Sequence, residues 1–149
     1  MSTYTQIACH IVFSPKRHMP VIRADHENDL YEIITETIHQ FRSIVYRING
    51  MPDHLHILCS IHPTISLSEF VKGIKICSSE AIKKNNLFSG FDHWQRGYAA
   101  FTVSYDRINA VIEYIKHQKE HHARVSYEDE IRKMLKESGV SFEEKYLFE

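Results

Sequence analysis

The chain of 149 residues contains 43% hydrophobic and 25% charged residues and has a formal net charge of −1. This length suits one domain with a substantial core, and the near-neutral balance argues against a strongly basic nucleic-acid binder. No apolar run approaches the roughly 20 residues of a membrane-spanning helix, and the N-terminal residues lack the pattern of a signal peptide. Three widely spaced cysteines without a CxxC motif indicate reduced thiols in a cytoplasmic protein.

The first half of the chain predicts, in order, a strand, a helix and two strands, at residues 3–14, 23–41, 43–48 and 54–61. The first strand alternates in polarity and ends before Pro15. Asp25 is the expected N-cap of the helix. The second and third strands are joined by a short link that contains Asn49-Gly50, a strong signal for a tight hairpin.

The second half predicts a helix, a strand and two further helices, at residues 66–85, 98–104, 106–125 and 126–139. Ser66 or Ser68 is expected to cap the first of these helices, and Ser126 the last. Gly139 marks the end of the last helix. The tail that follows, 140–149, carries apolar residues that suggest docking on a partner.

The order strand-helix-strand-strand-helix-strand is that of the ferredoxin-like split βαβ arrangement. We therefore expect an α+β fold with an antiparallel sheet, helices on one face and an additional C-terminal helix. No linker or repeat divides the chain, so it is read as one domain, 1–149, with a core over 1–125 and a C-terminal helix and tail over 126–149. Because this architecture hosts many functions, function has to be argued from individual residues.

Two histidines, His54 and His56, lie inside an otherwise apolar predicted strand. Side chains two residues apart on a strand point to the same face, so the two imidazoles stand side by side. Such a pair fills a core poorly but can hold a metal ion. Considered alone, it fits equally well a hydrogen-bonded pair on a half-exposed strand.

The third predicted helix adds a tyrosine and an amide. Tyr114 and Gln118 are one turn apart and therefore adjacent on the helix surface, beside the stripe formed by Ile108, Ile112 and Ile115. A tyrosine in such a place is, by itself, more often an aromatic at the boundary of the buried face than a nucleophile.

The same helix offers a different metal hypothesis. His117 and His121 have the i, i+4 spacing of an HExxH zinc site, but Gln118 replaces the glutamate expected after the first histidine. We therefore favour a solvated polar helix end over a zinc hydrolase.

The motif Pro-Asp-His-Leu-His at 52–56, followed by Tyr-Ile-Lys-His-Gln at 114–118, resembles the HUH single-tyrosine transposases of the TnpA type, the insertion-sequence-200-like family. In that family a His-hydrophobic-His motif lies on a sheet strand, and the tyrosine lies on a helix with a glutamine four residues later. The resemblance extends over most of the chain, including residues 4–22, 66–79 and 94–104. The acidic helix after Tyr127 is not part of it.

The resemblance implies that His54, His56 and Gln118 bind a divalent metal ion and that Tyr114 is the nucleophile. Attack by Tyr114 on a phosphodiester would give a 5′-phosphotyrosine and a free 3′-hydroxyl, and the covalent link would allow rejoining without ATP. The family implies Mg²⁺ or Mn²⁺, and the softness of imidazole ligands favours Mn²⁺. The expected function is that of a transposase, a metal-dependent DNA strand transferase.

The partners implied by the resemblance are single-stranded DNA with hairpin ends and a second copy of the chain, in a homodimer whose active sites are shared between subunits. Several basic residues could contact phosphates, and none is singled out: Lys16, Arg17, Lys83, Lys84 and Arg96. Two alternatives stay open, a domesticated transposase acting on repeat palindromes and a non-catalytic hairpin-binding module on the same sheet.

Overall fold

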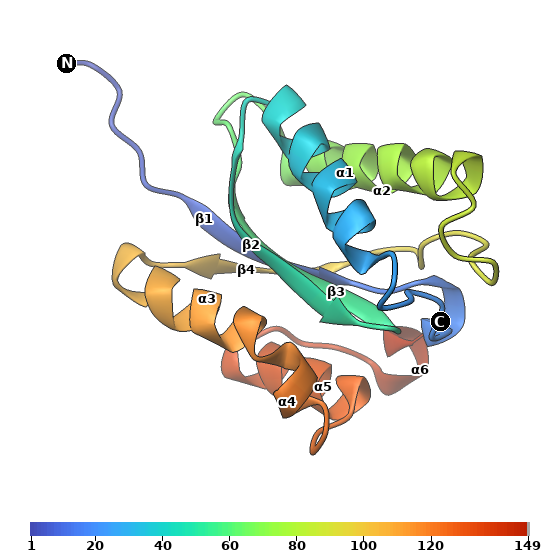
Figure 1. Cartoon of the computed structure of the whole chain (residues 1–149). Coiled ribbons are helices and arrows are strands. Elements are labelled where there is room, and N and C mark those ends of the chain that lie inside the picture. The colour runs from blue at the N-terminus through green and yellow to red at the C-terminus, as the bar shows by residue number, and fades with distance from the viewer. Residues whose placement is uncertain (149) are drawn as a thin grey trace.

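A four-stranded antiparallel sheet lies between two layers of helices in the computed structural model (Figure 1), which describes residues 1–148. The strands are β1 (Ala8–Phe13), β2 (Ile44–Met51), β3 (His54–Ser60) and β4 (Ala99–Val103), in the order β2-β3-β1-β4. Helix α1 (Glu27–Gln40) connects β1 to β2, and α2 (Leu67–Lys84) connects β3 to β4. This topology confirms the expected ferredoxin-like α+β fold.

The face of the sheet beneath α1 and α2 carries the main hydrophobic core. Because β1 and β3 alternate, their odd-numbered residues point to this face; the buried ones are Ile11, Phe13, Leu55, Ile57 and Cys59. The helices add apolar stripes, including Ile34 and Ile38 of α1 and Phe70 and Ile74 of α2. Burial of each such side chain stabilises the fold by about 1.5–3 kcal/mol. This core holds β1 and β3 rigidly and so fixes what their other face presents.

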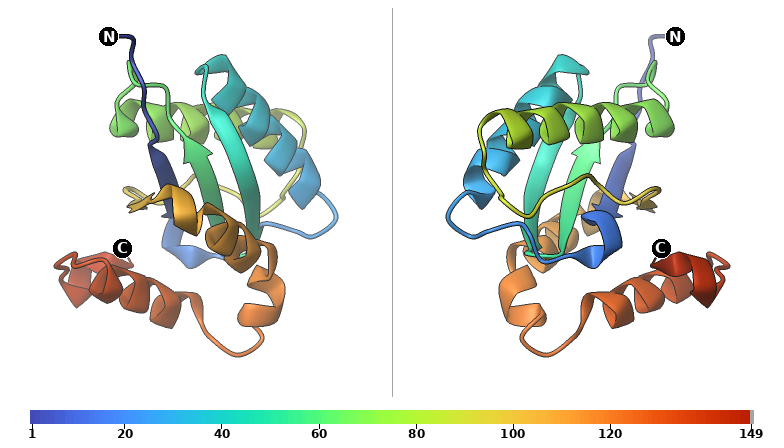
Figure 2. Two further views of the ribbon diagram at one scale, coloured as in Figure 1. Left: turned by 90° about the vertical axis from the view of Figure 1, so that its left-hand side faces the viewer. Right: turned by 90° about the vertical axis from the view of Figure 1, so that its right-hand side faces the viewer.

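The opposite face is covered by the helices that follow β4 (Figure 2): α3 (Ile108–Lys116), α4 (Gln118–His121) and α5 (Tyr127–Glu137). The expectation that the helices other than the C-terminal one share one face is therefore wrong for α3. Its apolar residues Ile108 and Ile115 pack on Ala8, Leu58 and Val103, which point away from α1 and α2. The even-numbered side chains of β1 and β3 point to this second face, where α3, α4 and α5 bury them.

The hairpin between β2 and β3 turns later than expected. The strand continues through Asn49-Gly50 to Met51, and the turn is made by Pro52-Asp53. Gly50 is required for packing within the strand rather than for a turn, because a Cβ atom there would lie 2.3 Å from the carbonyl oxygen of His54.

The expected helix-end residues are found at α2 and α5 but not at the start of α1. The hydroxyl oxygens of Ser66 and Ser126 accept hydrogen bonds from the third residues of α2 and α5, and Gly139 follows α5 with φ of +69°. Asp25 does not cap α1, whose N-cap is His26. The carboxylate of Asp25 instead lies 3.4 Å from Nε of Arg23.

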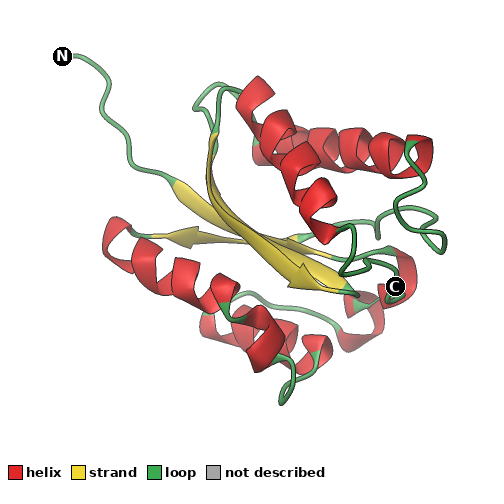
Figure 3. Cartoon of the chain, viewed as in Figure 1, coloured by secondary structure: helices red, strands yellow, loops and turns green. Residues whose placement is uncertain are grey.

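The expected single helix over 106–125 is divided. A short 3-10 turn, η2 (Tyr105–Arg107), precedes α3, and the backbone at His117 (φ −98°, ψ 23°) separates α3 from α4. Figure 3 shows the break between these helices and the other connections of the chain, among them a second 3-10 turn, η1 (Lys16–His18), after β1. Gln118 begins the helical turn after the break and is fully buried.

The C-terminal tail docks on its own chain. Phe142, Leu147 and Phe148, around the short helix α6 (Glu144–Leu147), pack against a cluster that includes Val12 and Leu135. The suggestion that the tail docks on a partner is therefore wrong for these apolar residues. Within the part of the chain that the structure describes, no helix is long and apolar enough to cross a membrane.

Candidate metal centre and nucleophile

His54 and His56 stand on the face of β3 that α3, α4 and α5 cover, and neither imidazole is exposed to solvent. The intervening Leu55 points to the main core. The prediction that both imidazoles share one face is therefore confirmed. They are buried by the C-terminal helices and form polar contacts there, so they do not stand on a half-exposed strand.

Both imidazoles are oriented by partners on their Nδ1 atoms. Nδ1 of His54 lies 2.7 Å from a carboxylate oxygen of Asp53, and Nδ1 of His56 lies 2.8 Å from Nε2 of His10. A metal-bound histidine is commonly held in this way through its second ring nitrogen. The arrangement leaves the Nε2 atoms of both residues directed toward the covering helices.

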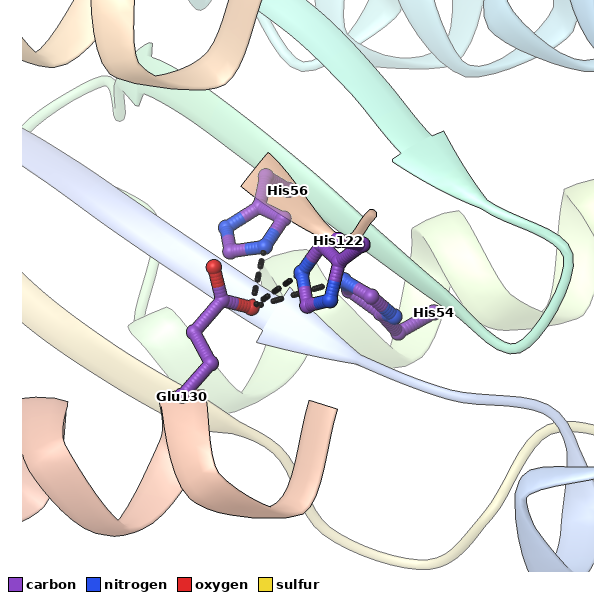
Figure 4. Close-up of side chains that lie close together, drawn as sticks. All are labelled: His54, His56, His122 and Glu130. Atoms are coloured by element: carbon purple, nitrogen blue, oxygen red, sulfur yellow. Dashed lines mark hydrogen bonds and ion pairs between the residues drawn. The ribbon is translucent and has the colours of Figure 1, made fainter. Parts of the chain in front are cut away.

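A glutamate from α5 meets these nitrogens (Figure 4). Oε1 of Glu130 lies 3.0 Å from Nε2 of His56, 3.1 Å from Nε2 of His122 and 3.4 Å from Nε2 of His54. One ligand atom from each of these four side chains lies within 4.8 Å of every other. Glu130 is 2% exposed, so a carboxylate and three imidazoles share one largely buried pocket.

The protonation of the pocket follows from burial and these contacts. Burial, reinforced by the neighbouring His56, lowers the pKa of His10 to about 3, so neutral His10 can accept a hydrogen bond from Nδ1–H of His56. Burial would raise the pKa of Glu130, but hydrogen bonds from His122, His54 and His56 outweigh it and hold that pKa well below its usual range. Burial would lower the pKa of His54, yet its bonds to Asp53 and Glu130 leave that pKa raised. Glu130 is thus an ionised carboxylate facing imidazoles.

The predicted amide and phenol reach the same carboxylate. Oε1 of Gln118 lies 3.3 Å from Nε2 of His54, and its Nε2 donates to Oε2 of Glu130 at 3.1 Å. The hydroxyl of Tyr114 also donates to Oε2 of Glu130. Burial, and then the negative charge of Glu130, raise the pKa of Tyr114 above its usual value. The four residues singled out from the sequence, His54, His56, Gln118 and Tyr114, therefore converge within a single chain.

The zinc hypothesis for the third predicted helix is not supported, although one of its two histidines reaches Glu130. His117 is exposed, and its Nδ1 donates to the carbonyl of Glu113 in its own helix, so the i, i+4 pair with His121 does not form a zinc site. His121 instead approaches Oε2 of Glu130 at 3.4 Å. Among the basic candidates, Lys16 pairs with Asp92 at 3.0 Å.

Sequence reasoning missed His122 and Glu130. Tyr127, Ile131 and Leu135 form the buried stripe of α5 at i, i+4 and i+8. Glu130 lies three residues after Tyr127 and therefore on the same side of the helix. A carboxylate on the buried side of a helix is the sequence signal that could have identified it. His122 gave no such signal, because its position depends on the break between α3 and α4.

The donor set is suited to a divalent metal ion. Imidazole nitrogens are ligands of transition metals, and carboxylate and amide oxygens also bind Mn²⁺. Three inward nitrogens facing one ionised oxygen leave the pocket in need of positive charge, which protons or a cation can provide. The residues present therefore fit the divalent metal that the resemblance implies.

Three comparisons relate the chain to known proteins. The family model described as "Transposase IS200 like" matches residues 3–118. The ISDra2 transposase TnpA of Deinococcus radiodurans is 27% identical over 119 residues, which are 76% of this chain and 84% of that protein. A crystal structure from Deinococcus radiodurans, assigned as a transposase, is similar with a TM-score of 0.59 at 22% identity, covering 79% of this chain and 95% of that one.

A second solved structure, that of a REP-associated tyrosine transposase bound to a REP hairpin, has a TM-score of 0.62 at 14% identity. The match covers 84% of this chain and 76% of that one. At these identities the two structures show a shared fold, whereas the family model spans most of the chain, including the His-Leu-His and Tyr-to-Gln motifs. The chain therefore belongs to the family of IS200-like transposases.

Proposed function

We propose that this transposase cleaves and rejoins single-stranded DNA at hairpin-bearing ends, with Tyr114 as the nucleophile and a divalent metal ion held by His54, His56 and Gln118. The observation that carries the proposal is the contact of a helix-borne phenol with the pocket that contains the two strand imidazoles and the amide.

In the proposed cleavage, the phenol oxygen of Tyr114 attacks the phosphorus and forms a new P–O bond. The bond from phosphorus to the 3′ oxygen breaks; the phenol proton is lost and the leaving 3′ oxygen gains one, so no proton is consumed overall. A bound divalent cation supplies positive charge that stabilises the phenolate and the non-bridging phosphate oxygens. Rejoining is the reverse attack by a different 3′-hydroxyl, and the phosphotyrosine bond conserves the energy for it.

The resting geometry agrees with this assignment. The Tyr114 phenol is protonated and held by Glu130, because burial and the carboxylate disfavour its ionised form. A phenol kept neutral in this way does not react until positive charge or a phosphate enters the pocket. The solved relative bound to a REP hairpin supports a DNA hairpin as the partner. The predicted cytoplasmic location stays a prediction.

The predicted homodimer with shared active sites stays a prediction. In this single chain Tyr114 contacts the pocket of its own subunit, which favours a site assembled in cis. Mixing Tyr114→Phe protein with His56→Ala protein distinguishes the two arrangements. A site assembled in cis would give no recovery of activity in the mixture, whereas the predicted site shared between subunits would recover part of it.

The direct test uses single strands that span hairpins in the DNA flanking the coding region, incubated with Mn²⁺ and separated under denaturing conditions. A 3′-terminal label should remain on the protein and a 5′-terminal label should be released, because a 5′-phosphotyrosine retains the downstream strand. Tyr114→Phe should abolish the adduct and leave hairpin binding unchanged. The matched control is Tyr105→Phe, a change at a tyrosine that is 78% exposed.

An adduct in the Tyr114→Phe protein would remove Tyr114 from its assigned role. Hairpin binding that forms no adduct with any divalent metal, and that is unaffected by loss of both strand histidines, would favour the non-catalytic binding module.

A further inference from the structure

We propose that His122 and Glu130 bind the same metal ion as His54, His56 and Gln118, so that this chain has a site with three imidazoles and one carboxylate that selects transition metals over Mg²⁺. The inference deepens the proposed function. It rests on that function because it concerns the same metal-binding pocket. Metal binding without DNA tests it independently of strand cleavage.

The distances from Oε1 of Glu130 to the three imidazole nitrogens fit those between neighbouring ligands of one metal ion. Neighbouring ligands of a tetrahedral ion with bonds of about 2.1 Å lie about 3.4 Å apart. Oε1 of Glu130 lies 3.0–3.4 Å from the Nε2 atoms of His56, His122 and His54. All four atoms lie within 4.8 Å of one another, so small side-chain adjustments would bring them around one ion.

The orientation of the strand histidines supports the same reading. Their Nδ1 atoms are already engaged, by Asp53 in one case and by His10 in the other. Each ring therefore directs its Nε2 toward Glu130. Without a metal ion this Nε2 donates a hydrogen bond to the carboxylate, and with an ion bound both atoms would be its ligands.

The charge of the pocket points the same way. The carboxylate of Glu130 is 2% exposed, and the described side chains place no lysine or arginine against it. Removal of a carboxylate from water is strongly unfavourable unless a positive charge compensates it. A divalent ion bound among the imidazoles would supply that charge.

Both added ligands come from beyond the segment that the family model matches, residues 3–118. His122 follows α4, and Glu130 is held in place because α5 docks through Tyr127 and Ile131. The ring of Tyr127 also stacks on His54, with centroids 4.3 Å apart and planes at 17°. Helix α5 thus contacts the histidine pocket through both Glu130 and Tyr127.

The second carboxylate oxygen links this site to the nucleophile. Oε2 of Glu130 receives the hydrogen bonds of Tyr114 and Gln118 and stays free of the ion if Oε1 binds it. The carboxylate then bridges the metal and the phenol. Because Mg²⁺ prefers six oxygen ligands, a nitrogen-rich shell favours Mn²⁺, Co²⁺ or Zn²⁺.

The test is titration calorimetry of the DNA-free protein with Mn²⁺, with Mg²⁺ as competitor. Glu130→Gln and His122→Gln should each lower Mn²⁺ affinity at least about tenfold. Their matched controls, Glu128→Gln on the exposed side of the same helix and His117→Gln at an exposed histidine, should bind as wild type. Excess Mg²⁺ should displace little Mn²⁺ from the wild-type protein.

Cobalt absorption supplies a second readout that needs no variant. Wild-type protein loaded with Co²⁺ should give the intense visible bands of a four- or five-coordinate ion. The weak bands of a six-coordinate ion would overturn the proposal. So would unchanged Mn²⁺ affinity in both folded ligand variants. If Glu130→Gln fails to fold, His122→Gln and the cobalt spectrum decide.

The two proposals fail separately. Loss of Mn²⁺ affinity in the variants, together with a wild-type protein that forms no DNA adduct, would support the ligands and refute the cleavage chemistry. An adduct that forms normally in a Glu130→Gln protein with unchanged Mn²⁺ affinity would support the cleavage chemistry and refute Glu130 as a ligand.

Discussion

Replacement of Leu135 by alanine should detach α5 from the sheet while the rest of the fold persists. An isolated helix of 11 residues is not stable in water, so α5 depends on its docking. Its buried stripe is Tyr127, Ile131 and Leu135, which together contribute about 4.5–9 kcal/mol before the cost of ordering the segment. Loss of the Leu135 side chain, 7% exposed, removes about 2–3 kcal/mol of this. That is a large part of the net docking free energy.

Hydrogen exchange measures this effect segment by segment. Amides of 127–137 should exchange at least tenfold faster in Leu135→Ala, whereas amides of β1 and β3 should be nearly unchanged, because the main core is untouched. Lys136→Ala, at an exposed position of the same helix, is the matched control. An equal loss of protection in α5 and β3 would contradict the reasoning, because it would mean that the helix and the sheet unfold as one unit.

Three further outcomes are expected from other parts of the molecule. Ser78→Ala should lower the free energy of unfolding in urea by about 1–3 kcal/mol, because the buried indole N–H of Trp94 donates to Ser78 Oγ at 2.9 Å and would lose its acceptor. Gly50→Ala should destabilise the hairpin by about 1–3 kcal/mol, since its Cβ would meet the backbone oxygen of His54; an unchanged melting temperature would refute the steric argument. Burial lowers the pKa of Lys75 to about 8, so the unfolded chain binds more protons between pH 8 and its unfolded pKa of 10.5. The stability of the wild type relative to Lys75→Met should therefore rise across that interval, and parallel melting curves from pH 8 to 10 would exclude the effect.

The strand and helix pattern could be predicted because it depends on local rules. Alternation in β1 and β3 separates the core face from the histidine face, and this gave the shared orientation of His54 and His56. Helix ends followed from Ser66 and Ser126, whose hydroxyl oxygens satisfy backbone N–H groups within the same turn. These features involve residues a few positions apart, so their spacing in the sequence is sufficient.

The errors arose where a distant part of the chain decides the local structure. Asn49-Gly50 is a turn signal by itself, but the close approach of β3 uses the missing side chain of Gly50 within the strand. The helix that carries Tyr114 was expected to continue beyond His117. It is interrupted at His117, and Gln118 begins the next helix. Neither outcome has a signal at the positions themselves.

Glu130 is the clearest case of a site residue whose role depends on tertiary structure. In the sequence it is one of several acidic residues in a helix outside the family motif, and only docking places it against His56, His122 and Tyr114. Its position is therefore sensitive to the packing of α5. If Glu130 is a metal ligand, Leu135→Ala should also weaken Mn²⁺ binding, although Leu135 contacts no ligand, because the helix that presents the carboxylate would be detached for part of the time. Full Mn²⁺ affinity in that variant, with exchange confirming a detached α5, would show that the ion is held by the strand histidines and Gln118 without help from the C-terminal helix.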